Sequence, residues 1–481
     1  MKSFCLFVFS VGLFFLSCRF EVDNSNKSGT SQTVETYGGT VKKESEYFKD
    51  GKKSSDWLFI HYMDADNSLD YGINGYPLFR DLNEIESGMF AIKKGDGTPK
   101  SDCDSVNYVV LFDGAKAGHP FTHLYDIGPD NNAGAIGSAT IDIIDVSFIK
   151  NADYEANMAD YKTLEKFLLW VNEHYEADHV IFVLGSHGGG PGGDSTYLDV
   201  NKSTRVICPD ETNAKNRYMS SREFAQAFKN AGYGLSNRLD MMLFDICLGA
   251  GFEDAYEIKD LAEYSIVSPE EIPGTGQNYA SLLELFNGRK GKLTVSDFGL
   301  GVCKNFFNAY YNLTNINGSA FYPTITMIDL SKVEACADAV NSMAAHIMAF
   351  AAPDVYRDYF NGVWKYKGFY NYLYDAGKFA CKVKEKAADA GVNNSASKVV
   401  SALDDMIVWS WKRKNDANDI FVNNAYIDGS YTAENSPYGV TLCGRSSSVL
   451  SVAIQPWYRT ELEFGRRDGG WADMIMKCFS K

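Results

Sequence analysis

Residues 239–251 read LDMMLFDICLGAG, an apolar run that ends in an acid, a thiol and glycine. A continuous apolar run of this kind predicts a strand that is buried on both faces of a sheet. Asp245 and Cys247 stand where the run ends. Because burial of the strand fixes its backbone, we expect both side chains to be held rigidly at the edge of the sheet.

Four further apolar runs predict strands at residues 57–63, 107–113, 179–186 and 264–268. Helical patterns separate several of them. Apolar residues follow a helical period between residues 160 and 175, and a capping box precedes a helix at Ser220–Glu223. Strands that alternate with helices predict a layered α/β domain with a largely parallel sheet. We place this domain at residues 51–290.

The pattern changes after about residue 290. Ser331 and Glu334 form a second capping-box pattern, residues 355–415 are mostly helical in pattern, and residues 438–456 are typical of a hairpin. We expect residues 291–481 to form an accessory region, or an extension that packs back on the first domain.

The N-terminus predicts export. Lys2 precedes an uncharged, mostly apolar stretch that is too short to span a bilayer comfortably and suits a signal peptide over residues 1–17. It ends in Leu16-Ser17-Cys18, which resembles a bacterial lipobox, so Cys18 is a candidate for lipidation and residues 18–50 for a polar tether. The protein would then lie in the bacterial cell envelope, anchored to a membrane. The alternative is a plain signal peptide and a secreted protein.

Composition limits the classes of partner. The chain of 481 residues is 45% hydrophobic and 14% aromatic, as expected of a well-packed globular protein. Its net charge of −16 argues against nucleic acid, because phosphate binding needs clustered Lys and Arg. The cysteines are widely spaced with no C-x-x-C pair, so the sequence indicates no zinc site and no disulfide pairing can be assigned.

Two of the predicted strands end in reactive residues. His187 and Gly188 follow one strand and Cys247 follows another, 60 residues later. A sheet with parallel strands would bring the two ends together. A thiolate can attack a carbonyl, a histidine can carry the proton, and backbone N–H groups can stabilise the oxyanion. A histidine or a cysteine alone is more often a structural residue than a catalytic one. The two together, each at a predicted strand end, are much less likely to occur by chance.

These segments resemble the signatures of the clostripain family of cysteine peptidases, which are relatives of caspases, gingipains and legumain. The resemblance is clearest over residues 55–285 and extends weakly to residues 324–335 and 370–380. It includes LFIHYMDADNSLD, RDLNEIESG, VNYVVLFDG and SIVSPEEIPGTGQNY. The last segment departs from the family at Gln277, where Trp is usual.

The resemblance implies a caspase-like three-layer α/β/α fold and roles for individual residues. Cys247 would be the nucleophile, His187 the acid and base, and the N–H groups of Gly188 and Cys247 the oxyanion hole. Asp245 would select Arg or Lys before the scissile bond, or else be a structural acid that caps nearby amides. Glu270, with its neighbour Glu271, is a secondary candidate for polar substrate contacts.

Two further segments carry weaker signals. The resemblance implies self-cleavage after a basic residue beyond the histidine strand, and Lys202 and Arg205 are the candidates; the alternative is an ordinary surface loop.

Residues 64–70, DADNSLD, have the acidic spacing that begins a calcium loop but lack its glycine and terminal Glu. We expect these acids to cap the next helix. No cofactor is expected to be required and no metal ligand is assigned, although calcium stays possible because some family members use it.

The sequence therefore predicts an exported cysteine endopeptidase that cuts protein or peptide substrates after basic residues through a Cys-His dyad and a thioester. Two alternatives stay open. One is a non-enzymatic, peptide-binding surface lipoprotein on a peptidase fold. The other is a transpeptidase or ligase of the same clan, in which an amine resolves the thioester instead of water.

Overall fold

The fold comes from a computed structural model. The residues that it describes are 40–71, 77–95, 97–100, 103–115, 118–119, 121–141, 155–191, 207–212, 218–287, 292–310, 324–363, 365–366, 373–413, 420–423, 438–444 and 456–479. Within these ranges no helix combines the length and apolar character needed to cross a membrane, and no disulfide joins two cysteines.

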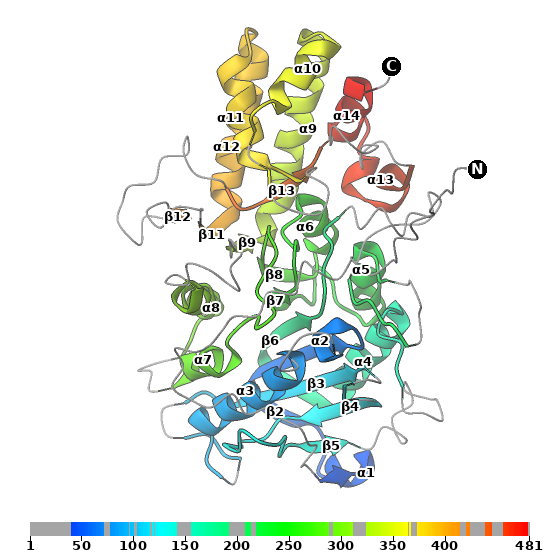
Figure 1. Ribbon diagram of the computed structural model, residues 1–481, viewed down its shortest axis with the longest axis vertical. Helices are drawn as coiled ribbons and strands as arrows, with labels where there is room; N and C mark the ends of the chain where they lie inside the picture. Colours follow the sequence, from blue (N-terminus) through cyan, green and yellow to red (C-terminus); the bar gives the residue numbers. More distant parts are fainter. Residues whose placement is uncertain are drawn as a thin grey trace, which may run out of the picture.

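One large sheet organises the molecule (Figure 1). Its eleven strands lie in the order β1-β5-β4-β3-β2-β6-β7-β8-β9-β11-β12. The central five, β3, β2, β6, β7 and β8, are mutually parallel, and antiparallel strands extend the sheet on either side. The strands are β1 (Val41–Lys42), β2 (Lys53–Ala65), β3 (Val106–Gly114), β4 (Phe121–Asp126), β5 (Ala139–Ile141), β6 (Tyr175–Gly185), β7 (Leu239–Asp245), β8 (Ala262–Val267), β9 (Thr324–Asp329), β11 (Ile407–Arg413) and β12 (Ile420–Asn423).

The five strands predicted from apolar runs are all present as the parallel core. Their side chains on both faces are buried, which explains why their sequences are continuous rather than alternating. In the pairing of β6 with β7, Gly185 lies opposite Asp245. The two strands therefore end level with each other, and the residues that follow them emerge at the same edge of the sheet.

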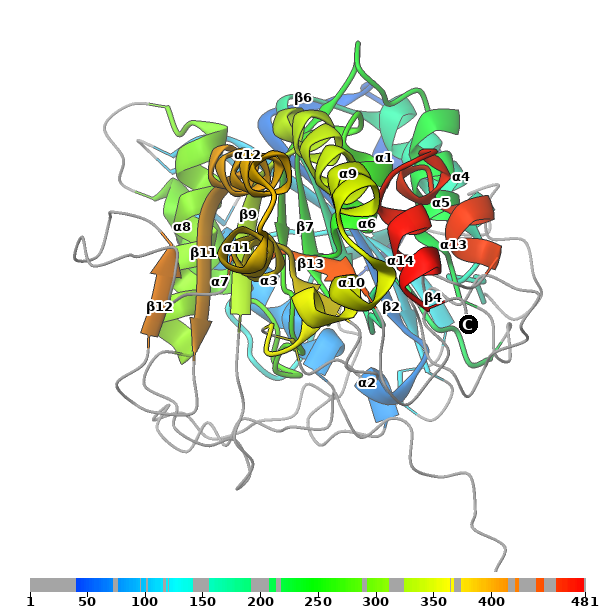
Figure 2. The same ribbon diagram turned by 90° about the horizontal axis from the view of Figure 1, so that it is seen from above.

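Helices cover both faces of the sheet (Figure 2). Helices α3, α7 and α8 pack together on one side, and α4, α5 and α6 on the other. The α/β/α layering that we expected is therefore confirmed. The helices are α1 (Glu44–Tyr47), α2 (Ser68–Tyr71), α3 (Pro77–Ile92), α4 (Tyr161–His174), α5 (Ser221–Asn230), α6 (Phe252–Ile258), α7 (Tyr279–Leu283), α8 (Val295–Tyr310), α9 (Val333–Phe350), α10 (Pro353–Phe360), α11 (Ala376–Lys386), α12 (Ala390–Met406), α13 (Pro456–Glu461) and α14 (Trp471–Phe479).

Helix starts were predicted with mixed success. The capping box at α5 is confirmed, since Ser220 and Glu223 each accept the other's backbone N–H. The second capping box is wrong. Ser331 lies inside a short 3₁₀ turn, Leu330–Lys332, and the side chain of Asp329 accepts its N–H at 2.9 Å. The capping acid therefore comes two residues earlier than the pattern indicated.

The C-terminal region is mostly helical, as expected, and α9 to α12 extend beyond one end of the sheet in Figure 1. It also adds β9, β11 and β12 to the large sheet, so one sheet crosses residue 290. The hairpin predicted at residues 438–456 lies partly outside the described residues and stays a prediction. Within the described residues, strand β13 (Thr441–Cys443) pairs with β10 (Leu373–Asp375), more than 60 residues earlier.

Candidate active site

The ends of β6 and β7 bring His187 and Cys247 into the same site. A Cβ atom on Gly188 would collide with the carbonyl oxygen of Cys247. Glycine is therefore required at this position, because the chain after the histidine lies directly against the chain of the thiol. Both functional side chains are largely buried, with 8% of His187 and 3% of Cys247 exposed.

The turn after Cys247 is strained and well supported. Leu248 adopts a φ of 59°, in the left-handed region that non-glycine residues rarely occupy. Its side chain is buried, and its N–H donates to the carbonyl oxygen of Glu270 at 3.0 Å. The N–H of Ile272 donates to the sulfur of Cys247 at 3.4 Å. The segment after β8 thus fixes the turn and also places a dipole that favours a thiolate.

Ser68 is a member of this site that the sequence did not reveal. Its Oγ lies 2.9 Å from Nε2 of His187, and the side chain is buried. Ser68 begins α2, just after β2, which is the parallel neighbour of β6. The available signal was its position, because polar residues that follow adjacent parallel strands meet at one edge.

Asp245 is buried two residues before Cys247, and one of its carboxylate oxygens has no hydrogen-bond partner. Its Oδ2 accepts the N–H of Gln277 and the hydroxyl of Tyr279, each at 2.9 Å. Its Oδ1 is buried without a hydrogen-bond partner. Burial raises the pKa of Asp245 to about 6, and the two hydrogen bonds oppose that shift. Asp245 therefore caps a nearby amide, as one interpretation proposed, and still offers an oxygen for another cation or donor.

The surroundings of Asp245 are acidic. Asp81, on α3, is buried with an unpartnered Oδ2, and the negative charges of Glu84 and Asp245 add to burial in raising its pKa. Glu84 accepts the N–H of Tyr279 at 3.2 Å. A raised pKa favours the protonated, neutral form of Asp81, so the negative field of this region comes mainly from Glu84 and the ionised form of Asp245.

A family model described as the clostripain family matches residues 61–463, which is most of the chain. The chain belongs to the clostripain family. It is 24% identical over 326 residues to clostripain from Hathewaya histolytica. That match covers 61% of this chain and 57% of the relative, so the chain spans little more than half the length of this curated protein.

Solved structures of the family share the fold. A secreted C11 cysteine protease from Bacteroides thetaiotaomicron, in complex with an irreversible peptide inhibitor, matches with a TM-score of 0.56 at 18% identity, over 85% of this chain and 97% of that chain. An inactive zymogen C11 protease from Parabacteroides distasonis matches with a TM-score of 0.57 at 18% identity, over 86% and 98%. The expected caspase-like architecture is therefore confirmed.

The departure of this clostripain-family chain at Gln277 leaves the contact with Asp245 intact. The hydrogen bond comes from the backbone N–H, which any residue except proline supplies. The side chain of Gln277 is itself buried, with 5% exposed. Gln277 therefore keeps the main-chain donor to Asp245.

Glu270 acts on the nucleophile turn through its backbone, as its contact with Leu248 shows. Its side chain is 4% exposed, whereas that of Glu271 is half-buried. A substrate contact for either side chain stays a prediction. Cys18, Lys202 and Arg205 lie outside the described residues, so lipidation and self-cleavage also stay predictions.

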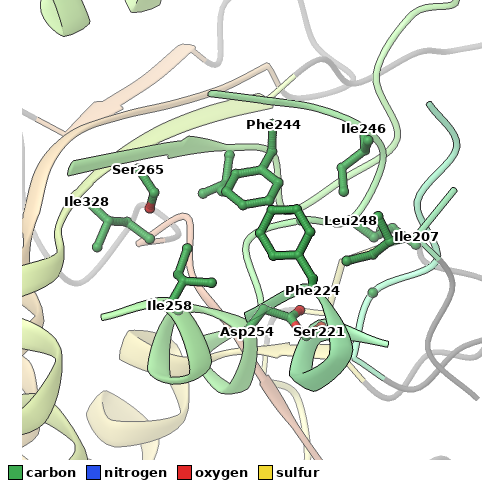
Figure 3. A pocket seen from close by; sticks show the side chains of 14 residues that line it. Ile207, Ser221, Phe224, Phe244, Ile246, Leu248, Asp254, Ile258, Ser265 and Ile328 are labelled. Carbon is green, nitrogen blue, oxygen red and sulfur yellow. Dashed lines mark hydrogen bonds between the residues drawn. The ribbon is translucent and has the colours of Figure 1, made fainter. Parts of the chain in front are cut away.

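A mainly apolar pocket lies beside the turn that holds Cys247 (Figure 3). Ile246 and Leu248, on either side of Cys247, line it together with Phe224 of α5 and Phe244 of β7. Neither His187 nor Cys247 contributes to it. The pocket is therefore distinct from these two residues, although the neighbours of Cys247 on both sides form part of its lining.

Ser68→Ala tests whether the hydroxyl orients the histidine of this clostripain-family site. We expect kcat to fall about 2- to 10-fold, the range of one net hydrogen bond, with little change in KM. Steady-state kinetics would measure this, and the pH dependence of kcat should also move because the group beside Nε2 has changed. Ser68→Thr, which keeps the hydroxyl, should restore most of the rate. Equal losses in both variants would indicate a packing role only.

Proposed function

We propose that this protein is a cysteine endopeptidase that hydrolyses peptide bonds after Arg or Lys. The observation that carries the proposal is the meeting of His187, Gly188 and Cys247 at the ends of two adjacent strands, with Asp245 buried beside them. Membership of the clostripain family supports the reaction class.

The first chemical step would be attack of the Cys247 thiolate on the scissile carbonyl carbon. This forms a tetrahedral oxyanion, which the N–H groups of Gly188 and Cys247 would stabilise. The oxyanion collapses to a thioester as the C–N bond breaks, and His187 gives its proton to the leaving amine. Because Ser68 lies 2.9 Å from Nε2, we propose that Nδ1 makes this transfer.

The second step would be hydrolysis of the thioester. His187, now neutral, takes a proton from water, and the resulting hydroxide attacks the acyl carbon. The C–S bond breaks, the thiolate of Cys247 leaves, and the new carboxylic acid departs. An amine could replace water in this step and would then form a new amide, which is the transpeptidase alternative.

Specificity for basic residues would come from Asp245. Its unpartnered Oδ1 could accept from a guanidinium or an ammonium group, and the ion pair would satisfy a buried oxygen that otherwise lacks a partner. The negative charge of nearby Glu84 favours the same choice.

The proposal is tested with a set of fluorogenic peptides that differ only in the residue before the scissile bond, namely Arg, Lys, Asp and Asn. We expect cleavage after Arg and Lys alone. Product mass in the presence of an added amine distinguishes hydrolysis from transfer. Binding of the peptides without turnover would favour the non-enzymatic alternative.

We further propose that the protein is exported and anchored through a lipid on Cys18, with protein or peptide substrates outside the cell. The apolar stretch before Cys18 and the polar residues after it support this proposal.

Self-processing is the last part of the proposed function, and we expect cleavage after Lys202 or Arg205. N-terminal sequencing of residues 19–481 should find a second N-terminus, at Ser203 or Val206, in the wild type only. Cys247→Ala should stay a single chain. A variant in which Lys202 and Arg205 are both changed to Gln should also stay whole. Full activity of that uncut variant would contradict a need for processing.

A further inference from the structure

A buried carboxylate holds the short helix that carries Ser68. Asp70 lies on α2, two residues after Ser68, and is completely buried. Its Oδ1 accepts Nδ1–H of His119 at 2.7 Å. Its Oδ2 accepts two backbone N–H groups, that of His119 at 2.6 Å and that of Ala115 at 3.0 Å. Because both residues lie between β3 and β4, Asp70 fastens α2 to the connection between these strands.

This contact is not the one that the sequence indicated. The interpretation that the acids of residues 64–70 cap the next helix is wrong for α2, because Asn67 provides the cap by accepting the N–H of Leu69 at 3.0 Å. Asp70 reaches away from its own helix instead. Helix capping therefore does not explain why its carboxylate is buried.

The connection between β3 and β4 is shaped around this carboxylate. A Cβ atom on Gly118 would collide with the side chain and the carbonyl oxygen of Asp70. The N–H of Gly118 donates to the carbonyl oxygen of Ala115 at 2.8 Å, which closes the turn. Glycine at this position therefore lets the backbone approach Asp70 closely enough for its N–H groups to donate.

The imidazole of His119 is fixed on its face as well as at its edge. Its ring lies flat on the ring of Phe79 of α3, with 3.6 Å between the centroids and 7° between the planes. Phe79 is completely buried and packs edge-on against Phe112 of β3. Only 7% of His119 is exposed. The hydrogen bond to Asp70 therefore starts from a side chain that packing already holds in place.

These contacts continue to the catalytic histidine through α2. Ser68, which begins the helix, places its Oγ 2.9 Å from Nε2 of His187. A helix of one turn has little stability of its own, so contacts with the rest of the protein set its position. Asp70 provides such contacts from the same turn, and its partners lie on a different segment from His187.

We propose that Asp70 and His119 form a positioning pair, which holds α2 so that Ser68 fixes the imidazole of His187. The inference rests on the proposed function, in which His187 is the acid and base. Because the pair acts through Ser68, breaking it should slow the chemical step and leave substrate binding nearly unchanged.

His119→Phe is the diagnostic variant. Phenylalanine keeps an aromatic face on Phe79 and loses the hydrogen bond to Asp70, which still accepts both backbone N–H groups. We expect kcat to fall about 2- to 10-fold with less than about twofold change in KM, as for Ser68→Ala. His119→Asn, whose side-chain amide can donate to Asp70, should restore part of this loss. Steady-state kinetics measures both variants, and circular dichroism checks each fold.

A double-mutant cycle shows whether the pair acts through Ser68. In a chain that already carries Ser68→Ala, His119→Phe should leave kcat within about twofold of Ser68→Ala alone, because the contact that it disturbs is gone. Effects of independent residues would multiply instead. The matched control is His179→Phe, since His179 donates to Asp240 at 3.0 Å and packs on Trp57, but lies on β6 far from its carboxyl end. It should change neither kcat nor KM.

Alkylation of Cys247 by iodoacetamide gives a readout that needs no peptide cleavage. An imidazole held beside a thiol raises the fraction of reactive thiolate. Mass mapping should therefore find slower alkylation of Cys247 in His119→Phe and in Ser68→Ala, with no further slowing in the double variant. If the wild type cleaves no peptide, the proposed function fails, and the alkylation rates still test the positioning pair.

Three results would overturn the inference. The first is His119→Phe with the kcat and the alkylation rate of the wild type. The second is a double variant in which the two losses multiply, since that would mean that the pair acts independently of Ser68. The third is a raised KM with unchanged kcat in His119→Phe, which would assign the pair to substrate binding.

Discussion

Cys247→Ala is expected to abolish peptide hydrolysis, with kcat/KM lowered by more than about 10⁴-fold. The reason is chemical: alanine offers no electron pair to attack the carbonyl, so no thioester forms. The fold should survive, because the thiol is small and buried, and alanine removes one sulfur atom from a turn that its neighbours hold. Fluorogenic peptides ending in Arg or Lys measure the loss, and circular dichroism checks the fold.

Cys303→Ala is the matched control. Cys303 is also completely buried, on α8 of the same molecule, and burial raises the pKa of its thiol. It should lose some stability through the small cavity, about 1 kcal/mol or less per missing group, and keep its activity. Similar activity losses in the two variants would show that stability, and not nucleophilic attack, explains the effect.

Asp245→Asn is expected to reduce cleavage after Arg and Lys by about 10²- to 10³-fold in kcat/KM, the cost of removing one partner of a buried charge pair. Asn can still accept hydrogen bonds from the N–H of Gln277 and the hydroxyl of Tyr279, so these two groups should keep their positions. Asp240→Asn, at the other end of the same strand, is the control and should cleave normally. If Asp245→Asn still prefers Arg and Lys before the scissile bond as strongly as the wild type does, Asp245 is a structural acid only.

The same carboxyl group predicts a pH dependence. Because burial raises the pKa of Asp245 to about 6, the group gains its proton as the pH falls through 6, and a neutral carboxyl cannot pair with a cation. The affinity of Cys247→Ala for agmatine, an arginine-like amine, should therefore fall between about pH 8 and pH 5. Calorimetry measures this, and Asp245→Asn should bind weakly throughout. An affinity that does not change with pH would contradict the ionised pocket.

The parallel core and the placement of His187 and Cys247 after two adjacent strands were predictable from sequence because their signals are local. Residues 180–184 and 241–244 are apolar without interruption, and such runs are typical of strands in the middle of a covered sheet. The position of Cys247 and His187 relative to each other then follows from strand geometry alone. The capping box at Ser220 was also readable, since both of its partners lie within one turn.

The features that the sequence did not predict depend on contacts between residues that are far apart in the chain. Asp70 and His119 are 49 positions apart, and only the folded chain joins them. Strand β13 was recognisable as a strand, but its short sequence does not specify β10 as its partner. Ser68 could have been proposed from strand order, had β2 been placed beside β6 before the structure was known.

The central claim is that Cys247 is a nucleophile in a pocket for basic residues. The most direct measurement is reaction of residues 19–481 with peptidyl electrophiles that end in Lys or in Asp, followed by mass mapping of the adduct. We predict one adduct, on Cys247, with the Lys probe and little with the Asp probe. An adduct on another cysteine, or none with intact and folded protein, would contradict the account.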